Sequence, residues 1–247
     1  MRVAATLASV AMVTAMTMAV SSTATAAIDT GVASVSPGPG QTVGVAHPVT
    51  VTFTEPVRDR TAAENSISVE PAGAPASLPG TTRWLDGRSV QWEPAEFFPA
   101  HTPITVSGGG FATSFQTGSS VVGVADLSAY TFTVSIDGVV AREMPASMGK
   151  PKFPTPTGRF TALSKERNVT FDSRTIGIPL DDEEGYLIKG EYGVRVTWGG
   201  VYVHSAPWSV GSQGYANVSH GCINLSPDNA AWYFDTVSVG DPIIVQA

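Results

Sequence analysis

The chain has 247 residues, of which 43% are hydrophobic and only 14% charged, and its formal net charge is −7. This negative balance excludes a typical nucleic-acid-binding protein, because such proteins need a concentrated basic face. The 25 glycines and 18 prolines are poor material for long helices, so the composition favours β structure.

The chain begins with an apolar segment typical of a secretory signal peptide. Arg2 precedes the apolar run Val3–Val20, and Ala24-x-Ala26 follows as a cleavage site of small residues. We therefore expect residues 1–26 to be a signal peptide and the mature protein to be exported to a periplasm-like space or the cell wall. An uncleaved signal that anchors the protein in the membrane is the alternative. No cysteine stands directly after the apolar run, which excludes a lipoprotein anchor there.

Residues 27–121 carry the pattern of a small antiparallel sandwich. A proline- and glycine-rich stretch at residues 36–40 leads into short segments of strand character separated by turn residues. These segments are Val49–Phe53, Ser66–Val69, Ser89–Trp92 and Pro103–Val106. His47 and His101 each stand alone near a proline, so we expect both to be structural. This half therefore offers no candidate catalytic cluster.

Residues 122–247 begin with a clear hairpin. Tyr130–Ile136 alternates polar and apolar residues and meets Asp137-Gly138, which is typical of a type I′ turn, before Val139–Arg142. A second hairpin is expected where Val194–Trp198 and Val201–His204 flank two glycines. It would place His204 at the end of a strand, where a side chain can reach a cleft.

One helix and one further strand complete the predicted elements. Ser226 is a candidate N-cap, Pro227 suits the first helical position, and Asp228 lies in the first turn. The helix should end before Gly240, and Ile243–Val245 should form the last strand. The expected fold class is mainly β, with one or two short helices.

The only cysteine of the chain lies in a segment that indicates nucleophilic catalysis. Cys222 belongs to Ser219–Asn224, whose sequence is Ser-His-Gly-Cys-Ile-Asn, and His204 precedes it in the second hairpin. A free thiol has a pKa near ~8.5, so it needs a base such as an imidazole to attack at neutral pH. We expect Cys222 to be the nucleophile and His204 its base, with Gly221 permitting a tight turn before the sulfur.

These residues resemble the signature of the L,D-transpeptidases with a YkuD-type catalytic domain. The segment Met148–Phe160, which contains Pro-Thr-Pro-Thr-Gly, is similar to a second stretch of that family. The resemblance covers residues 122–247. Residues 27–121 resemble the immunoglobulin-like domain that precedes the catalytic domain in mycobacterial and other actinobacterial members.

The resemblance implies a role for further residues. The backbone carbonyl of Ser205 would orient the imidazole, and Trp208 would belong to a lid that continues to Gly214. The implied substrate-binding residues are Tyr186, Gly199, Gly200, Trp208, Ser219, His220 and Asn224. From the residues alone, His220 is better explained as shaping the loop than as transferring a proton. Ile176 stands where mycobacterial members tend to carry a tyrosine, so lid contacts or the acceptor path are expected to differ.

The resemblance also implies the reaction. Cys222 would attack a diaminopimelate carbonyl of a peptidoglycan tetrapeptide stem, release D-alanine, and pass the acyl group from the thioester to the diaminopimelate amine of a neighbouring stem as a 3→3 cross-link. Carbapenem-type β-lactams would acylate the same sulfur. No cofactor or metal is expected. Hydrolysis of the same acyl-enzyme, as in an L,D-carboxypeptidase, is the alternative reaction, whereas the loop does not have the pattern of a sortase.

Two further classes of function compete with the enzyme. His204, His220 and Cys222 would supply three ligands to a zinc ion. A structural zinc site, however, needs four ligands, which usually come in pairs that are close together in the sequence. A non-catalytic cell-wall-binding protein would explain the sandwich, but it gives no reason for the His-Gly-Cys segment.

Overall fold

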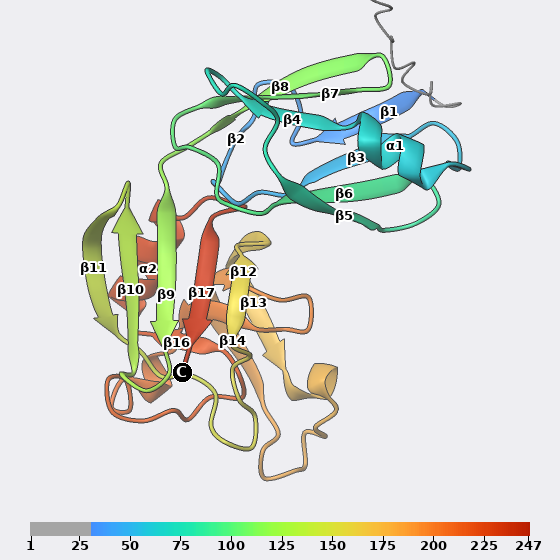
Figure 1. Ribbon diagram of the computed structural model, residues 1–247. Coiled ribbons are helices and arrows are strands. Elements are labelled where there is room, and N and C mark those ends of the chain that lie inside the picture. The colour runs from blue at the N-terminus through green and yellow to red at the C-terminus, as the bar shows by residue number, and fades with distance from the viewer. Residues whose placement is uncertain (1–30) are drawn as a thin grey trace, which may run out of the picture.

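The structure is a computed structural model that describes residues 31–247, so the predicted signal peptide lies outside the described residues. Two lobes follow each other along the chain, as Figure 1 shows, and each has its own buried apolar core. Both are built mainly from β-strands, as predicted. Within residues 31–247 no helix is long and apolar enough to cross a membrane.

The first lobe is a sandwich of two four-stranded sheets, in the strand orders β1-β3-β6-β5 and β2-β8-β7-β4. Its elements are β1 (Val32–Ser36), β2 (Thr42–Val43), β3 (Val49–Phe53), α1 (Arg60–Ser66), β4 (Ser68–Pro71), β5 (Gly80–Trp84), β6 (Ser89–Pro94), β7 (Pro103–Gly108) and β8 (Phe111–Thr117). In β3 every second residue is buried between the sheets, because successive side chains of a strand point to opposite faces.

The predicted strands of this lobe agree with β3, β6 and β7, but the segment at residues 66–69 is placed too early. Residues 60–66 form helix α1, whose first turn is capped by the carboxylate of Asp59, which accepts a hydrogen bond of 2.9 Å from the Ala62 amide. The following strand, β4, therefore begins at Ser68.

The second lobe contains a five-stranded sheet of order β11-β10-β9-β17-β12, a four-stranded sheet of order β13-β14-β15-β16, and helix α2. Its elements are β9 (Val121–Asp126), β10 (Thr131–Ile136), β11 (Val139–Pro145), β12 (Gly158–Thr161), β13 (Ser164–Asp172), the 3₁₀ turn η1 (Ser173–Ile176), β14 (Leu187–Arg195), β15 (Tyr202–Ser205), the 3₁₀ turn η2 (Pro207–Ser209), β16 (Ile223–Leu225), α2 (Pro227–Thr236) and β17 (Pro242–Gln246).

Both predicted hairpins form. Asp137 and Gly138 have φ angles of 49° and 82°, as a type I′ turn requires, between β10 and β11. The second hairpin joins β14 to β15, but its regular strand ends at Arg195 rather than Trp198. The Thr197–Gly200 segment makes a wider turn instead, with Gly200 at a φ of 100°.

Helix α2 and strand β17 confirm the predicted end of the chain. Pro227 opens the helix after Ser226, although the Ser226 side chain makes no capping hydrogen bond. Tyr233 of α2 is buried against Phe132 of β10, with ring centroids 4.8 Å apart. The helix thus contacts the sheet of β10 through Tyr233 and packs against β14 and β15 of the other sheet, within the core shared by both sheets.

The two lobes are joined by backbone hydrogen bonds as well as by the chain. The amides of Gly44 and Ala46 donate to the carbonyls of Val239 and Gly240, each at 2.9 Å. The buried carboxylate of Asp241 accepts from the amide of Val45 at 3.3 Å. A Cβ on Gly44 would lie 2.0 Å from the Asp241 nitrogen, so only glycine allows this approach.

Candidate active site

The strands β15 and β16 bring the predicted nucleophile and base together. They pair in parallel, with His204 opposite Asn224, and Cys222 directly precedes β16. Because side chains alternate along a strand, Cys222 and Asn224 face the same side as His204. Parallel pairing needs a long connection, which residues 206–222 provide.

His204 is held in one orientation. Its Nδ1 lies 2.8 Å from the carbonyl oxygen of Ser205, so Nδ1 carries the proton and donates it, as the family resemblance implied. Its ring is buried against Phe171, with centroids 4.3 Å apart. Burial lowers the pKa of His204 to about 4, which leaves Nε2 unprotonated at neutral pH and able to accept a proton.

Cys222 is half-buried at the floor of a cleft and carries a neutral thiol. Its sulfur lies 3.7 Å from the carbonyl oxygen of Gly200, which can accept the S–H. Burial raises the pKa of the Cys222 thiol to about 11. A neutral thiol and a neutral imidazole therefore line the same cleft.

The nucleophile loop, residues 219–222, is shaped by hydrogen bonds of its own. Ser219 Oγ donates to the carbonyl oxygen of Cys222 at 2.6 Å and accepts from the amide of Gly221 at 3.0 Å. Gly221 has a φ of 115°, in the region that favours glycine. The tight turn predicted before the sulfur is thus present.

The Pro-Thr-Pro segment stabilises the nucleophile loop through hydrogen bonds of Thr155. The buried Thr155 hydroxyl donates to the carbonyl oxygen of Gly221 and accepts from the amide of Gly149, both at 2.8 Å. Gly149 also forms an isolated bridge with Ser219. The two sequence motifs, more than sixty residues apart in the chain, therefore form one structural unit.

The cleft above the sulfur has a volume of about 260 Å³ and contains most of the predicted site residues. Those that line it are Tyr186, His204, Trp208, Ser219, His220, Cys222 and Asn224. Trp208 lies in η2 with its ring 5.9 Å from that of His204. The side-chain amide of Asn224, which was predicted to bind substrate, donates a hydrogen bond to Ser209 Oγ at 3.1 Å.

The other predicted residues lie outside the cleft lining. Gly199 and Gly200 form the hairpin turn, and only the carbonyl of Gly200 approaches the sulfur. Their contact with substrate stays a prediction. Gly214 is fixed by a hydrogen bond from its amide to the Ala146 carbonyl, and Ile176 is a partly exposed residue at the end of η1.

Comparison with known proteins gives the same picture for both lobes. The sequence model of the L,D-transpeptidase catalytic domain, YkuD, matches residues 120–245, and that of a bacterial Ig domain matches residues 3–109. The chain belongs to the YkuD family of L,D-transpeptidases. L,D-transpeptidase 1 of Mycobacterium tuberculosis is 61% identical over 215 residues, which are 87% of this chain and 84% of the relative.

Solved structures of such enzymes share the whole arrangement. An L,D-transpeptidase from Mycobacterium smegmatis superposes with a TM-score of 0.84 at 66% identity and covers 88% of this chain and 99% of its own. An L,D-transpeptidase solved in complex with imipenem superposes with a TM-score of 0.81 at 60% identity, again covering 88% of this chain and 99% of its own. The first lobe is thus an Ig-like domain and the second an L,D-transpeptidase catalytic domain.

Sequence reasoning missed several residues of this L,D-transpeptidase site. Phe171, Ile188, Val218 and Ser209 line the cleft from strands and loops without a motif. Glu184 is the most consequential omission, because its carboxylate lies 2.8 Å from His220 Nε2. The run Asp-Asp-Glu-Glu at residues 181–184 was the available signal, but nothing local to it indicates a partner 36 positions away.

The histidines of the L,D-transpeptidase site are engaged with protein partners. His204 bonds the Ser205 carbonyl and His220 faces Glu184. Across residues 31–247 no group of three or more histidine, cysteine, aspartate or glutamate side chains is arranged to hold a metal ion.

Proposed function

We propose that the protein forms 3→3 cross-links in peptidoglycan through a thioester on Cys222. The observation that carries the proposal is the pairing of β15 with β16, which sets a buried imidazole, held through Nδ1 by the Ser205 carbonyl, on the same face as the only thiol. Family membership supports transfer between peptide stems. The Ser205 carbonyl, rather than a carboxylate, orients the base.

In the first half-reaction the sulfur bonds to the L-centre carbonyl carbon of diaminopimelate in a tetrapeptide stem. His204 Nε2 takes the thiol proton and returns it to the amine as the amide C–N bond breaks, so D-alanine leaves. In the second half-reaction the side-chain amine of a neighbouring stem attacks the thioester, its proton passes through His204, and the thiol is restored. Each half-reaction is balanced without a cofactor.

The same sulfur is proposed as the site of acylation by carbapenem-type β-lactams. The relative solved in complex with imipenem supports this, because it shares the catalytic domain and the whole arrangement of lobes. The lactam carbonyl takes the place of the scissile amide, and ring opening leaves a thioester on Cys222. The apolar run at residues 3–20 supports export of the protein to the compartment where peptidoglycan lies.

The proposal is tested with a defined disaccharide tetrapeptide that contains meso-diaminopimelate. The wild type should give a dimer that has lost one D-alanine, identified by mass and by fragmentation across the diaminopimelate bridge. Cys222→Ala should give none, with an unchanged circular dichroism spectrum. A product dominated by free tripeptide would instead establish an L,D-carboxypeptidase, and turnover by Cys222→Ala would reject the thioester.

A further inference from the structure

A loop of residues 177–186, called the flap below, forms one wall of the cleft. Its last four residues, from Glu183 to Tyr186, all line the cleft. Both ends of the flap are tied to Ser173, which is fully buried. The Ser173 hydroxyl donates to the Ile178 carbonyl at 2.9 Å and accepts from the Tyr186 amide at 3.0 Å. The flap is therefore fixed at its base.

The distal part of the flap has a defined shape. Asp182 accepts from the amide of Glu184 at 2.9 Å, and a Cβ on Gly185 would lie 2.5 Å from the Pro179 carbonyl oxygen. These contacts give the distal part a fixed internal shape. Its position over the cleft then depends on what holds it to the rest of the domain.

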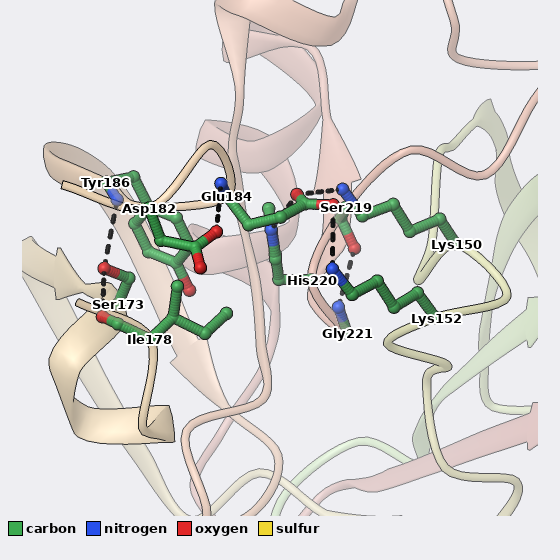
Figure 2. A network of polar contacts seen from close by, with 10 residues as sticks. All are labelled: Lys150, Lys152, Ser173, Ile178, Asp182, Glu184, Tyr186, Ser219, His220 and Gly221. Carbon is green, nitrogen blue, oxygen red and sulfur yellow. Dashed lines mark hydrogen bonds and ion pairs between the residues drawn. The ribbon is translucent and has the colours of Figure 1, made fainter. Parts of the chain in front are cut away.

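Glu184 supplies that connection. Its carboxylate accepts from the ammonium of Lys150 and from the ring N–H of His220 Nε2, the latter at 2.8 Å, and Lys152 Nζ lies 3.7 Å away. Figure 2 shows Glu184 between these three side chains. Among the described residues, each hydrogen bond and ion pair between the flap and either residues 149–153 or the nucleophile loop ends on this carboxylate.

The His220 ring places this connection next to the substrate wall. It lies between Phe153 and Tyr186, with ring centroids 4.8 and 4.9 Å away. Tyr186, His220 and Cys222 all line the same cleft, so the phenol and the sulfur face one space. Holding His220 against Glu184 therefore also holds Tyr186 at a fixed place beside the nucleophile.

We propose that Glu184 is a positioning residue that latches the flap onto the nucleophile loop and so sets Tyr186 beside Cys222. The inference rests on the proposed acyl transfer at Cys222. Lys150 foremost, with His220, holds the pKa of Glu184 below its ordinary value, so the latch is charged throughout the neutral range. The side chains of Lys150 and Glu184 are only 26% and 23% exposed, which reduces screening by salt.

A latch and a group that activates the thiol make different predictions. A latch is needed by a bulky acyl donor, which must be oriented by the cleft wall, but not by a small alkylating reagent, which needs only access to the sulfur. Loss of the latch should therefore slow acylation by a carbapenem without slowing alkylation of Cys222 by iodoacetamide. Loss of an activating group would slow both reactions together.

The test compares Glu184→Ala and Glu184→Gln with the wild type in the full chain. Acylation by a carbapenem should be slowed by about tenfold to a hundredfold in Glu184→Ala, as expected for one lost charge-assisted hydrogen-bond network. Glutamine keeps an acceptor oxygen but no charge, so Glu184→Gln should fall between. The matched control is Asp181→Asn, which removes an exposed carboxylate of the same flap outside the cleft lining and should acylate at the wild-type rate.

Hydrogen exchange gives a readout independent of chemistry, because amides of residues 177–186 should exchange faster in the Glu184 variants than in Asp181→Asn. If Glu184→Ala does not fold, Lys150→Met removes the main partner and should act in the same direction. Acylation unchanged in Glu184→Gln and Lys150→Met, or acylation and alkylation slowed by the same factor, would overturn the latch. Failure of the wild type itself to acylate would instead reject the proposed function.

Discussion

The neutral state of the catalytic pair predicts an unusual dependence of acylation on pH. In the proposed mechanism, acylation needs an unprotonated His204, and burial lowers the pKa of its imidazole to about 4. At about pH 5 such an imidazole is roughly 90% neutral, whereas an ordinary one with a pKa near 6.5 is roughly 3% neutral. The acylation rate should therefore fall by only about 10% between pH 7 and pH 5. With an unperturbed histidine as the base, the rate would fall roughly 25-fold over the same range.

The measurement is the acylation rate of the wild type by a carbapenem, followed by loss of lactam absorbance at limiting protein and confirmed by intact mass. Activity is present above the lowered pKa and should be lost as the pH falls through about 4. Tryptophan fluorescence must show a folded protein at each pH, and a protein-free blank corrects for lactam hydrolysis. A midpoint between about pH 6 and 7 in a folded sample would refute a buried neutral imidazole.

Three further outcomes follow from contacts elsewhere in the molecule. Thr155→Val should lower both the free energy of unfolding and the acylation rate, since two buried hydrogen bonds worth about 1–3 kcal/mol in total are lost behind the nucleophile loop; unchanged urea unfolding would contradict this. Gly44→Ala should lower the melting temperature while leaving acylation intact, because its Cβ would lie 2.0 Å from the Asp241 nitrogen. Burial raises the pKa of Asp241 to about 6, so its stabilising contribution is complete below about pH 4 and is lost as the pH rises through 6. Asp241→Asn should flatten that part of the stability curve measured by urea unfolding, and an unaltered curve would argue against the shift.

Local signals explain which parts of the fold were predictable. Asp137-Gly138 demands two positive φ angles, and Pro227 suits only the first turn of a helix, so each residue type largely determines its own backbone. Helix α1 was missed because its seven residues include a single buried side chain, Ala63, and therefore carry little apolar periodicity. The end of β14 at Arg195 depends on the wide turn that follows, which its alternating sequence does not encode.

The site residues also fall into those that the sequence could predict and those that it could not. Cys222 and His204 could be predicted to lie in one site because a lone thiol and a histidine at a strand end are chemically distinctive, and both line the cleft. The orientation of His204 by the neighbouring Ser205 carbonyl followed from family resemblance and is present. The roles of Thr155 and Glu184 arise only when distant segments pack together, so no spacing along the chain reveals them.

The backbone bonds between the lobes also determine how the protein transmits force. The amides of Gly44 and Ala46 bond residues that directly precede β17, and β17 is flanked by β9 and β12 within its sheet. A pull on the Ig-like domain is therefore borne by these bonds in parallel with the single covalent connection, and it reaches a strand whose hydrogen bonds on both sides must break together. Tension on the Ig-like domain should therefore enter the five-stranded sheet at two adjacent strands, at β9 through the covalent connection and at β17 through the bonds to Val239 and Gly240.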